Sequence, residues 1–209
     1  MLLLVWWLAL ARLGDEGALR VRATAAVAPC VEAAARAYEK KARRVVVETG
    51  GLGDTGPADV FVGSAAEVTR ALEGGAAILD SDAEVARVRW LLVVPEGNPH
   101  QIRGLADLDR AAVEVWIAGG PAAYEARRAV QKLAPERARE ASDGAVPRGA
   151  AAALAPLCLA GPGERVTVDV PDLVVQAAVS ARASRPDAAR DFVAFLASPA
   201  GRGAFAPAP

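Results

Sequence analysis

The sequence has few of the residues on which catalysis and metal binding most often depend. Its 209 residues include one histidine, His100, one methionine and two cysteines. A catalytic zinc site needs about three His, Cys or carboxylate ligands held together, and neither such a cluster nor a Gly-x-Ser-x-Gly nucleophile motif is present. A serine nucleophile also needs a base, and none is evident near Ser64. We therefore expect no enzyme activity, no metal site and no cofactor, and an exposed His100.

An excess of charge of either sign is also missing. The formal net charge is −1, so nothing favours nucleic acid or an anionic membrane surface as a partner. Apolar residues make up 53% and charged residues 23% of the chain, which is typical of a globular protein rather than a disordered one. The length suits one sizeable core or two small lobes of about 80 to 100 residues.

One long apolar run is present, from Met1 to Ala11 at the N-terminus. At about ten residues it is too short to span a bilayer but fits the apolar region of a secretory signal, although no Lys or Arg precedes it. Small residues between Ala11 and Ala18 offer cleavage sites, and no Cys follows for a lipid anchor. We expect residues 1–17 to be a signal peptide and the remainder a soluble periplasmic protein. The alternatives are a buried first strand and a mis-assigned start.

The two cysteines, Cys30 and Cys158, lie far apart in the sequence. In an exported protein they could form a disulfide, but sequence alone cannot show whether they meet. A buried cysteine is more often simply a small apolar residue. Cysteines that face each other across a cleft could form a disulfide or bind a soft metal ion, so these alternatives stay open here.

Strand-like and helix-like segments alternate along the chain. Such alternation is typical of an α/β fold whose parallel sheet is covered on both faces. We expect strands at 19–27, 45–48, 59–63, 88–97, 113–120 and 165–180, and helices at 28–44, 64–75, 102–110, 121–134, 147–157 and 186–197, with a short helix after the Ser198-Pro199 break.

Three stretches of the chain resemble type II periplasmic solute-binding proteins. Residues 91–108, LLVVPEGNPHQIRGLADL, resemble the strand, Pro-x-Gly-Asn-Pro turn and Leu-x-Asp-Leu helix through which that family's chain enters its second lobe. Residues 56–68, GPADVFVGSAAEV, resemble its Ala-Asp-Val-Phe strand with Ser at a helix start. Residues 188–205, AARDFVAFLASPAGRGAF, resemble its C-terminal Phe-x-x-Phe-Leu-x-Ser-Pro-x-Gly pattern. In length and layout the nearest subfamily is the molybdate-binding proteins of ABC importers.

The resemblance implies a two-lobed α/β fold, each lobe a mixed, mostly parallel sheet flanked by helices. Two crossover strands would join lobe 1, at 18–88 and 166–209, to lobe 2, at 89–165, and such hinged lobes close on a ligand. The implied function is capture of a small-molecule ligand by a monomer that serves an ABC permease. The implied ligand is a tetrahedral oxyanion such as molybdate or tungstate. The alternative is a degenerate sensor or partner-docking module that does not serve transport.

The resemblance also marks four helix starts that would face the ligand. Free N–H groups and the helix dipole at such starts favour anions. The implied ligand-binding residues are Ala26, Val27, Ser64, Ala65, Ala122, Ala123, Tyr124, Pro147 and Arg148, together with Cys158 near the end of lobe 2.

Several of these candidates have a structural alternative. Ser64 and Glu67 also fit a capping box, Tyr124 could be half-buried packing, and Arg148 could be a solvated surface residue.

Three regions depart from the molybdate-binding pattern. Ala26 stands where that subfamily usually has Ser, and Cys158 roughly where it has Tyr, so two hydroxyl donors are missing. The 49–58 connection is short and glycine-rich where the subfamily places a helix. A tight connector is favoured there over a cradle for phosphate-like oxygens, because Lys and P-loop spacing are absent. These departures favour the sensor or docking module, whereas the hinge and C-terminal motifs favour the transport receptor.

Overall fold

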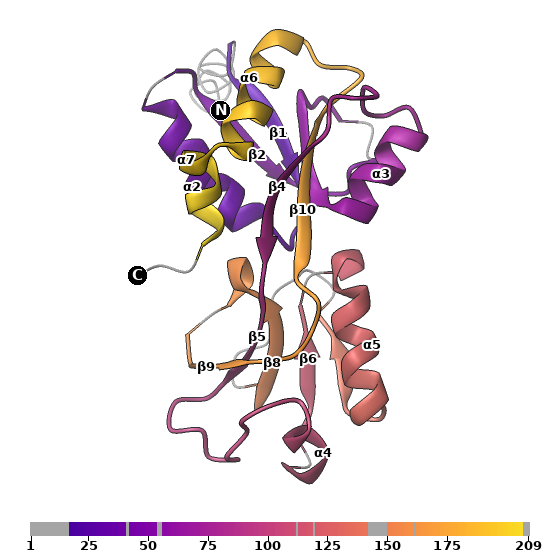
Figure 1. The fold of residues 1–209 in the computed structure, drawn as a ribbon, viewed down its shortest axis with the longest axis vertical. Coiled ribbons are helices and arrows are strands. Elements are labelled where there is room, and N and C mark those ends of the chain that lie inside the picture. The colour runs from indigo at the N-terminus through magenta and orange to yellow at the C-terminus, as the bar shows by residue number, and fades with distance from the viewer. Residues whose placement is uncertain are drawn as a thin grey trace, which may run out of the picture.

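The computed structural model describes residues 17–40, 42–53, 56–111, 113–118, 120–141, 150–160 and 162–206. The expected signal peptide, apart from Gly17, and the candidates Pro147 and Arg148 lie outside these ranges. Inside them, no helix combines the length and hydropathy needed to cross a bilayer. Figure 1 shows two lobes, one above the other, joined by a narrow waist of strands, which confirms the predicted two-lobed architecture.

Lobe 1 is built on a five-stranded sheet of order β2-β1-β3-β10-β4. The first three strands pair in parallel, and β10 pairs antiparallel with both β3 and β4. All five residues of β3 are buried, because helices and loops cover both faces of the sheet. The strands are β1 (Leu19–Ala23), β2 (Val45–Thr49), β3 (Val60–Ser64), β4 (Ala83–Val88) and β10 (Leu173–Val179).

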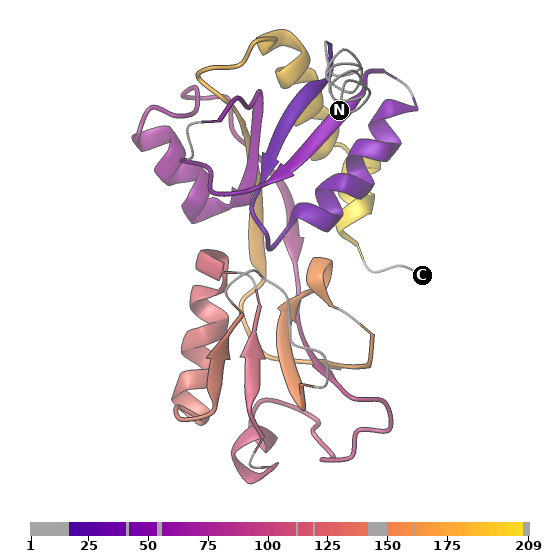
Figure 2. The same ribbon diagram turned by 180° about the vertical axis from the view of Figure 1, so that it is seen from behind.

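Helices flank this sheet on both sides (Figures 1 and 2). On one side α2 (Ala28–Glu39) packs against α6 (Pro186–Ala197), α7 (Pro199–Arg202) and η3 (Gly203–Phe205), and α3 (Ala65–Glu73) lies on the other. The ring of Tyr38 on α2 lies 5.0 Å from that of Phe192 and 5.1 Å from that of Phe195. The C-terminal helices therefore return to lobe 1, as the motif at 188–205 predicts.

The connection from β2 to β3 forms no helix in its described residues, 50–53 and 56–59. Its Leu52 is 5% exposed and packs in a small apolar cluster with Phe61, Val68 and Ala178. The short connection therefore covers a sheet face itself, as a tight connector would.

Lobe 2 holds a second five-stranded sheet, of order β7-β6-β8-β5-β9. Its strands are β5 (Trp90–Val94), β6 (Val115–Ile117), β7 (Ala138–Glu140), β8 (Ala152–Pro156) and β9 (Glu164–Thr167). Its helices are α4 (Asp107–Ala111), η1 (Gly120–Ala123), α5 (Tyr124–Leu133) and η2 (Leu157–Leu159). As in lobe 1, two of the four strand pairings are parallel and two antiparallel, so the predicted mixed character is confirmed and parallel pairings make up half.

The helix expected at 147–157 is wrong where the structure describes it. Residues Ala152–Pro156 form β8, which pairs with β6 on one side and β5 on the other. Alanine-rich sequence favours a helix intrinsically, but propensity is a weak prior that tertiary context overrides. Here all five residues are buried in the middle of a sheet.

Two crossovers, which run side by side, join the two lobes. The first passes through Arg89 between β4 and β5, and the second through residues 168–172 between β9 and β10. Val88 pairs with Leu173 in the first sheet, and Leu91 pairs with Thr167 in the second. Because β9 stays in the second sheet through Thr167, the chain returns to lobe 1 after that residue.

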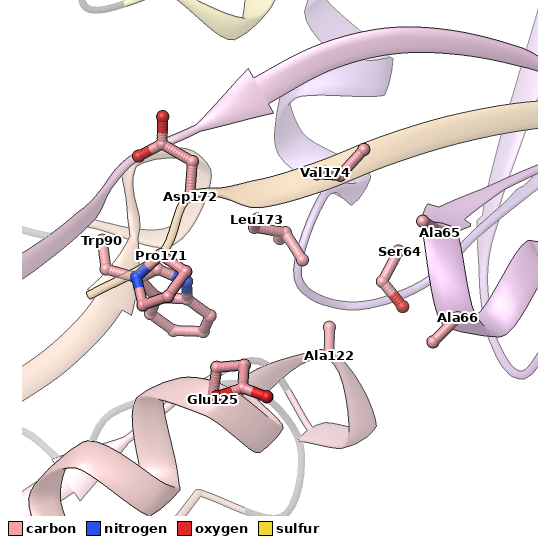
Figure 3. A pocket seen from close by; sticks show the side chains of 10 residues that line it. All are labelled: Ser64, Ala65, Ala66, Trp90, Ala122, Glu125, Pro171, Asp172, Leu173 and Val174. Carbon is pink, nitrogen blue, oxygen red and sulfur yellow. The ribbon is translucent and has the colours of Figure 1, made fainter.

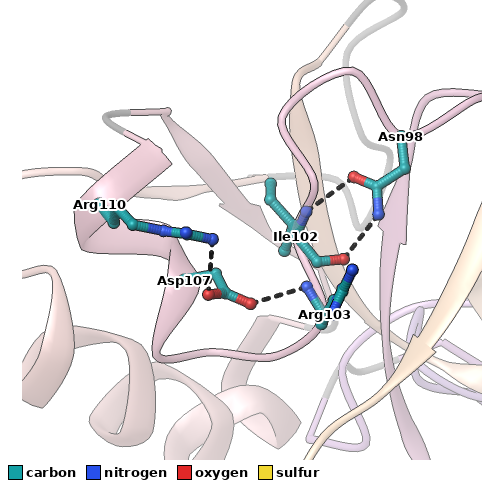
Figure 4. Close-up of polar contacts among 5 residues, drawn as sticks. All are labelled: Asn98, Ile102, Arg103, Asp107 and Arg110. Atoms are coloured by element: carbon teal, nitrogen blue, oxygen red, sulfur yellow. Dashed lines mark hydrogen bonds and ion pairs between the residues drawn. The ribbon is translucent and has the colours of Figure 1, made fainter.

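The turn after β5 is fixed by one asparagine. Asn98 lies in the left-handed region, with φ of 41°. Its Oδ1 accepts the Ile102 N–H at 2.8 Å, and its Nδ2 donates to the Ile102 carbonyl at 2.7 Å (Figure 4). Asp107 then accepts the Arg103 N–H at 2.8 Å. The Pro-x-Gly-Asn-Pro motif therefore sets the chain direction into lobe 2. His100, the residue directly after it, is exposed, as expected.

Candidate ligand-binding cavity between the lobes

A cavity of about 160 Å³ lies where both lobes and both crossovers meet. Its lining comes from the start of α3 in lobe 1, from η1 and α5 in lobe 2, and from the waist between them (Figure 3). The lining residues are Ser64, Ala65, Ala66, Trp90, Ala122, Glu125, Pro171, Asp172, Leu173 and Val174. A site assembled in this way changes shape whenever the lobes move, which is how a hinged fold couples binding to closure.

The lobe 1 wall is the first turn of α3. Ser64 ends β3 in an extended conformation, with ψ of 154°, and caps the helix. Ala65 and Ala66 follow as its first two residues, whose N–H groups have no acceptor within a helix. Both residues line the cavity. The helix start thus offers two backbone donors and the positive end of the helix dipole.

Glu67 turns back onto this same helix start. Its Oε2 accepts the Ser64 N–H at 3.0 Å and the Ser64 hydroxyl at 2.7 Å, and its own N–H donates to Ser64 Oγ at 3.3 Å. The capping box considered as the structural alternative is therefore present. It engages the hydroxyl hydrogen of Ser64, so only the N–H groups of Ala65 and Ala66 stay free for a ligand at this wall.

The lobe 2 wall is the junction of η1 and α5. Ala122 lines the cavity, whereas Ala123 is 1% exposed and packs into the core. Tyr124 is 60% exposed and is not among the lining residues. Its side chain is therefore neither half-buried in packing nor part of the cavity lining. Glu125, one residue further, does reach the cavity.

The waist between the lobes supplies the remaining lining residues of the cavity, among them a second carboxylate, that of Asp172. Trp90 is 1% exposed and is the first residue of β5; Pro171 comes from the returning crossover, and Leu173 is the first residue of β10. Figure 3 shows the Asp172 carboxylate directed away from the centre of the cavity. Glu125 and Asp172 are the charged side chains of the lining, with no Lys, Arg or His among the residues that line it. Both are exposed, so solvent and salt screen their charges.

The start of α2 lies elsewhere. Ala26 and Val27 are fully buried and are not among the lining residues. Val27 is the N-cap of α2 without a side-chain hydrogen bond, and its N–H and that of Ala28 donate to the Thr24 carbonyl at 3.0 Å. The Thr24 hydroxyl oxygen is buried without a hydrogen-bond partner. The N–H groups of Val27 and Ala28 are therefore already paired with the preceding backbone, and Pro29 has no N–H to donate.

Cys158 is joined to Cys30 by a disulfide, with their Cα atoms 5.5 Å apart. The disulfide is one of the alternatives that the sequence left open, and neither cysteine lines the cavity. In the described part of the chain, no group of three or more His, Cys, Asp or Glu side chains is placed to hold a metal ion.

Sequence reasoning named three of the ten lining residues, Ser64, Ala65 and Ala122, and missed the rest. Ala66 and Glu125 lie one residue beyond predicted positions, so reading a full helical turn would have included them. Trp90 and residues 171–174 flank the two crossovers, and the resemblance already placed the crossovers near 89 and 166.

Comparisons with known proteins identify the family of the chain. The family model described as bacterial extracellular solute-binding protein matches residues 19–160. A search of curated proteins found no match.

Three solved structures share the fold. The molybdate-binding protein of Azotobacter vinelandii has a TM-score of 0.72 at 16% identity, covering 90% of this chain and 96% of that one. The sulfate-binding protein SubI of Mycobacterium tuberculosis has 0.72 at 20%, covering 90% and 84%. Iron-bound HitA of Pseudomonas aeruginosa has 0.61 at 18%, covering 90% and 83%. Since these are a molybdate-binding, a sulfate-binding and an iron-bound protein, the fold alone does not choose the ligand.

Proposed function

Because the chain belongs to the bacterial extracellular solute-binding proteins, we propose that it is an exported receptor that captures a small solute between its lobes for an ABC importer. The observation that carries this proposal is the cavity lined by both lobes and both crossovers. A ligand there would contact every part that moves, so binding would favour the closed arrangement that a permease could recognise. The apolar N-terminal run supports export, and the proposal assigns no catalytic step.

For the ligand we propose a tetrahedral oxyanion such as molybdate or tungstate. Support comes from the start of α3, where two N–H groups and the helix dipole meet the cavity. The volume of about 160 Å³ suits a small ion rather than a large organic molecule. Structural neighbours named for molybdate and sulfate agree with this choice.

A second candidate is a binding-fold sensor or docking module outside transport. The observation that favours it is the charge at the cavity: Glu125 and Asp172 line it, and the carboxylate of Glu67 already occupies the Ser64 hydroxyl. These groups repel an anion, so the cavity would suit an oxyanion receptor less well than its backbone donors alone suggest.

Thermal unfolding of the chain without residues 1–17 separates the candidates. The panel holds molybdate, tungstate, sulfate and phosphate, with ferric iron as a contrast of opposite charge. A ligand at about 100 times its Kd adds about 2.7 kcal/mol, which for a chain of this size raises Tm by roughly 5 to 10 °C. A selective rise with one oxyanion would support the receptor. A flat panel would overturn the oxyanion assignment and favour the second candidate.

A further inference from the structure

The disulfide between Cys30 and Cys158 ties the two lobes together. Cys30 lies in the first turn of α2 in lobe 1, and Cys158 lies in η2 of lobe 2, 128 residues further along the chain. The two crossovers are the backbone connections between the lobes in the described chain. The disulfide is thus a third covalent connection, and it involves a different pair of elements.

The crossovers alone form a single hinge point. They run side by side, with Val88 paired to Leu173 just before the waist and Leu91 paired to Thr167 just after it. Two adjacent strands resist stretching, but they allow both bending and twisting of the lobes they connect. With this connection alone, lobe 2 could swing toward or away from lobe 1 in more than one direction.

The disulfide is anchored in rigid parts of both lobes. The Leu157 N–H donates to the Arg89 carbonyl at 2.9 Å, which fixes η2 against the first crossover. Cys30 is 8% exposed and belongs, with Val31 and Ala34 of α2, to the main apolar core. A bond between two such elements transmits restraint to whole lobes rather than to a loose loop.

We propose that this disulfide confines lobe motion to rotation about one line, which runs from the crossovers to the Cys30–Cys158 bond. A body held at two separate points can rotate only about the line that joins them. The side where α2 meets η2 then stays closed, and the cavity opens only between α3 and η1. The cavity lining fits this axis, because it includes residues of α3 and η1 and none of α2 or η2. The inference rests on the fold and the disulfide, not on the ligand.

Single-molecule fluorescence energy transfer on the ligand-free chain tests the axis. Dyes are attached through azide-bearing non-canonical residues, so that no new cysteine disturbs the disulfide. One pair, at Arg36 of α2 and Arg165 of β9, spans the side that should stay closed, and a second, at Arg70 of α3 and Lys132 of α5, spans the side that should open (Figure 1). All four side chains are exposed.

In the oxidised chain we expect a narrow distance distribution for Arg36–Arg165 and a broad one for Arg70–Lys132. In the C30S/C158S variant both distributions should be broad. The wild-type chain is also compared before and after treatment with dithiothreitol, so that the conclusion does not depend on how well the variant folds. The reductant should leave the distance distributions of C30S/C158S unchanged. An Arg36–Arg165 distribution that is unaltered by losing the bond would overturn the proposal, as would a narrow Arg70–Lys132 distribution in the oxidised chain. A disulfide that only stabilises the fold would give these contrary results, whether or not any ligand binds.

Discussion

Two helices begin at the same edge of the lobe 1 sheet, and their first turns differ completely. The start of α3 opens onto the cavity, with Ala65 and Ala66 in the lining. The start of α2 is buried at Ala26 and Val27, and Cys30 in its first turn forms the disulfide with Cys158 of lobe 2. A helix N-terminus can bind an anion only where its N–H groups are free and accessible. We therefore propose that the α3 start contacts the ligand, whereas the α2 start lies beside the disulfide that joins the lobes.

The largest expected effect concerns the α2 start. Replacing both cysteines, as C30S/C158S, should lower the free energy of unfolding by about 2 to 4 kcal/mol, because the bond closes a long loop in the unfolded chain. For a chain of this size the corresponding drop in Tm is roughly 4 to 16 °C. Calorimetry measures it, and a reductant should produce a similar drop in the wild type. An unchanged Tm in both experiments would contradict the disulfide.

The next effect isolates one backbone donor of the α3 start. Ala65→Pro removes the Ala65 N–H at the first helical position, which tolerates proline, as Pro186 and Pro199 show at the starts of α6 and α7. Ser64 is already extended, as a residue before proline must be. Loss of a hydrogen bond to a charged ligand costs about 1.5 to 3 kcal/mol.

Oxyanion affinity should therefore fall roughly 10- to 100-fold, with little change in Tm. Titration calorimetry measures the affinity. Ala65→Gly keeps the N–H and is the matched control, which should bind nearly as the wild type does. Equal affinity in the Pro variant would remove Ala65 from the site.

A smaller effect is expected for the cap of α3. Ser64→Ala breaks the capping box, so it should destabilise the chain by about 1 kcal/mol, measured by urea unfolding. Because the Ser64 hydroxyl hydrogen is donated to Glu67, we expect oxyanion affinity to change little. Ser198→Ala is the control: it removes the cap of α7, Ser198 is not among the residues that line the cavity, and the change should cost a similar amount. A large affinity loss in Ser64→Ala alone would show that the hydroxyl turns to the ligand.

The smallest expected effect reports the sign of the ligand's charge. Glu125→Gln removes a carboxylate from the cavity lining, and exposed charges interact by about 1 kcal/mol or less in water. Oxyanion affinity should rise about two- to fivefold, with less change in Asp172→Asn, whose carboxylate is directed away from the cavity (Figure 3). Titrations with the oxyanion at low and high salt measure it, and a fall in oxyanion affinity would contradict repulsion between Glu125 and the ligand.

The fold could be predicted because its signals are local and repeated. Three segments each satisfy their own backbone groups or bury their own apolar face: the turn at 95–99, the strand and helix at 60–73, and the C-terminal helices. The prediction of a helix at 147–157 was wrong because the conformation of residues 152–156 is determined by their strand pairing with β5 and β6. Local propensity carries no information about those partners.

The site could be predicted only in part for the same reason. The α3 start follows from Ser64 and Glu67, which are close in sequence. Trp90, Glu125 and Asp172 are far apart in the sequence and meet only through the tertiary fold of lobe 2 and the returning crossover. Cys30 meets Cys158 across a separation of 128 residues. Whether a helix start is free or buried is a property of packing, so Ala26 and Val27 could not be told apart from Ala65 by sequence.

The most direct test of the contrast between the two helix starts is a titration followed by backbone amide NMR. The oxyanion that raises Tm most is added to the labelled chain, and the amide shifts of both helix starts are compared. We expect the largest changes at Ala65, Ala66 and Ala122, with Ala26 and Val27 almost unmoved. Dominant changes at Ala26 and Val27 would contradict the account and place the ligand at the start of α2.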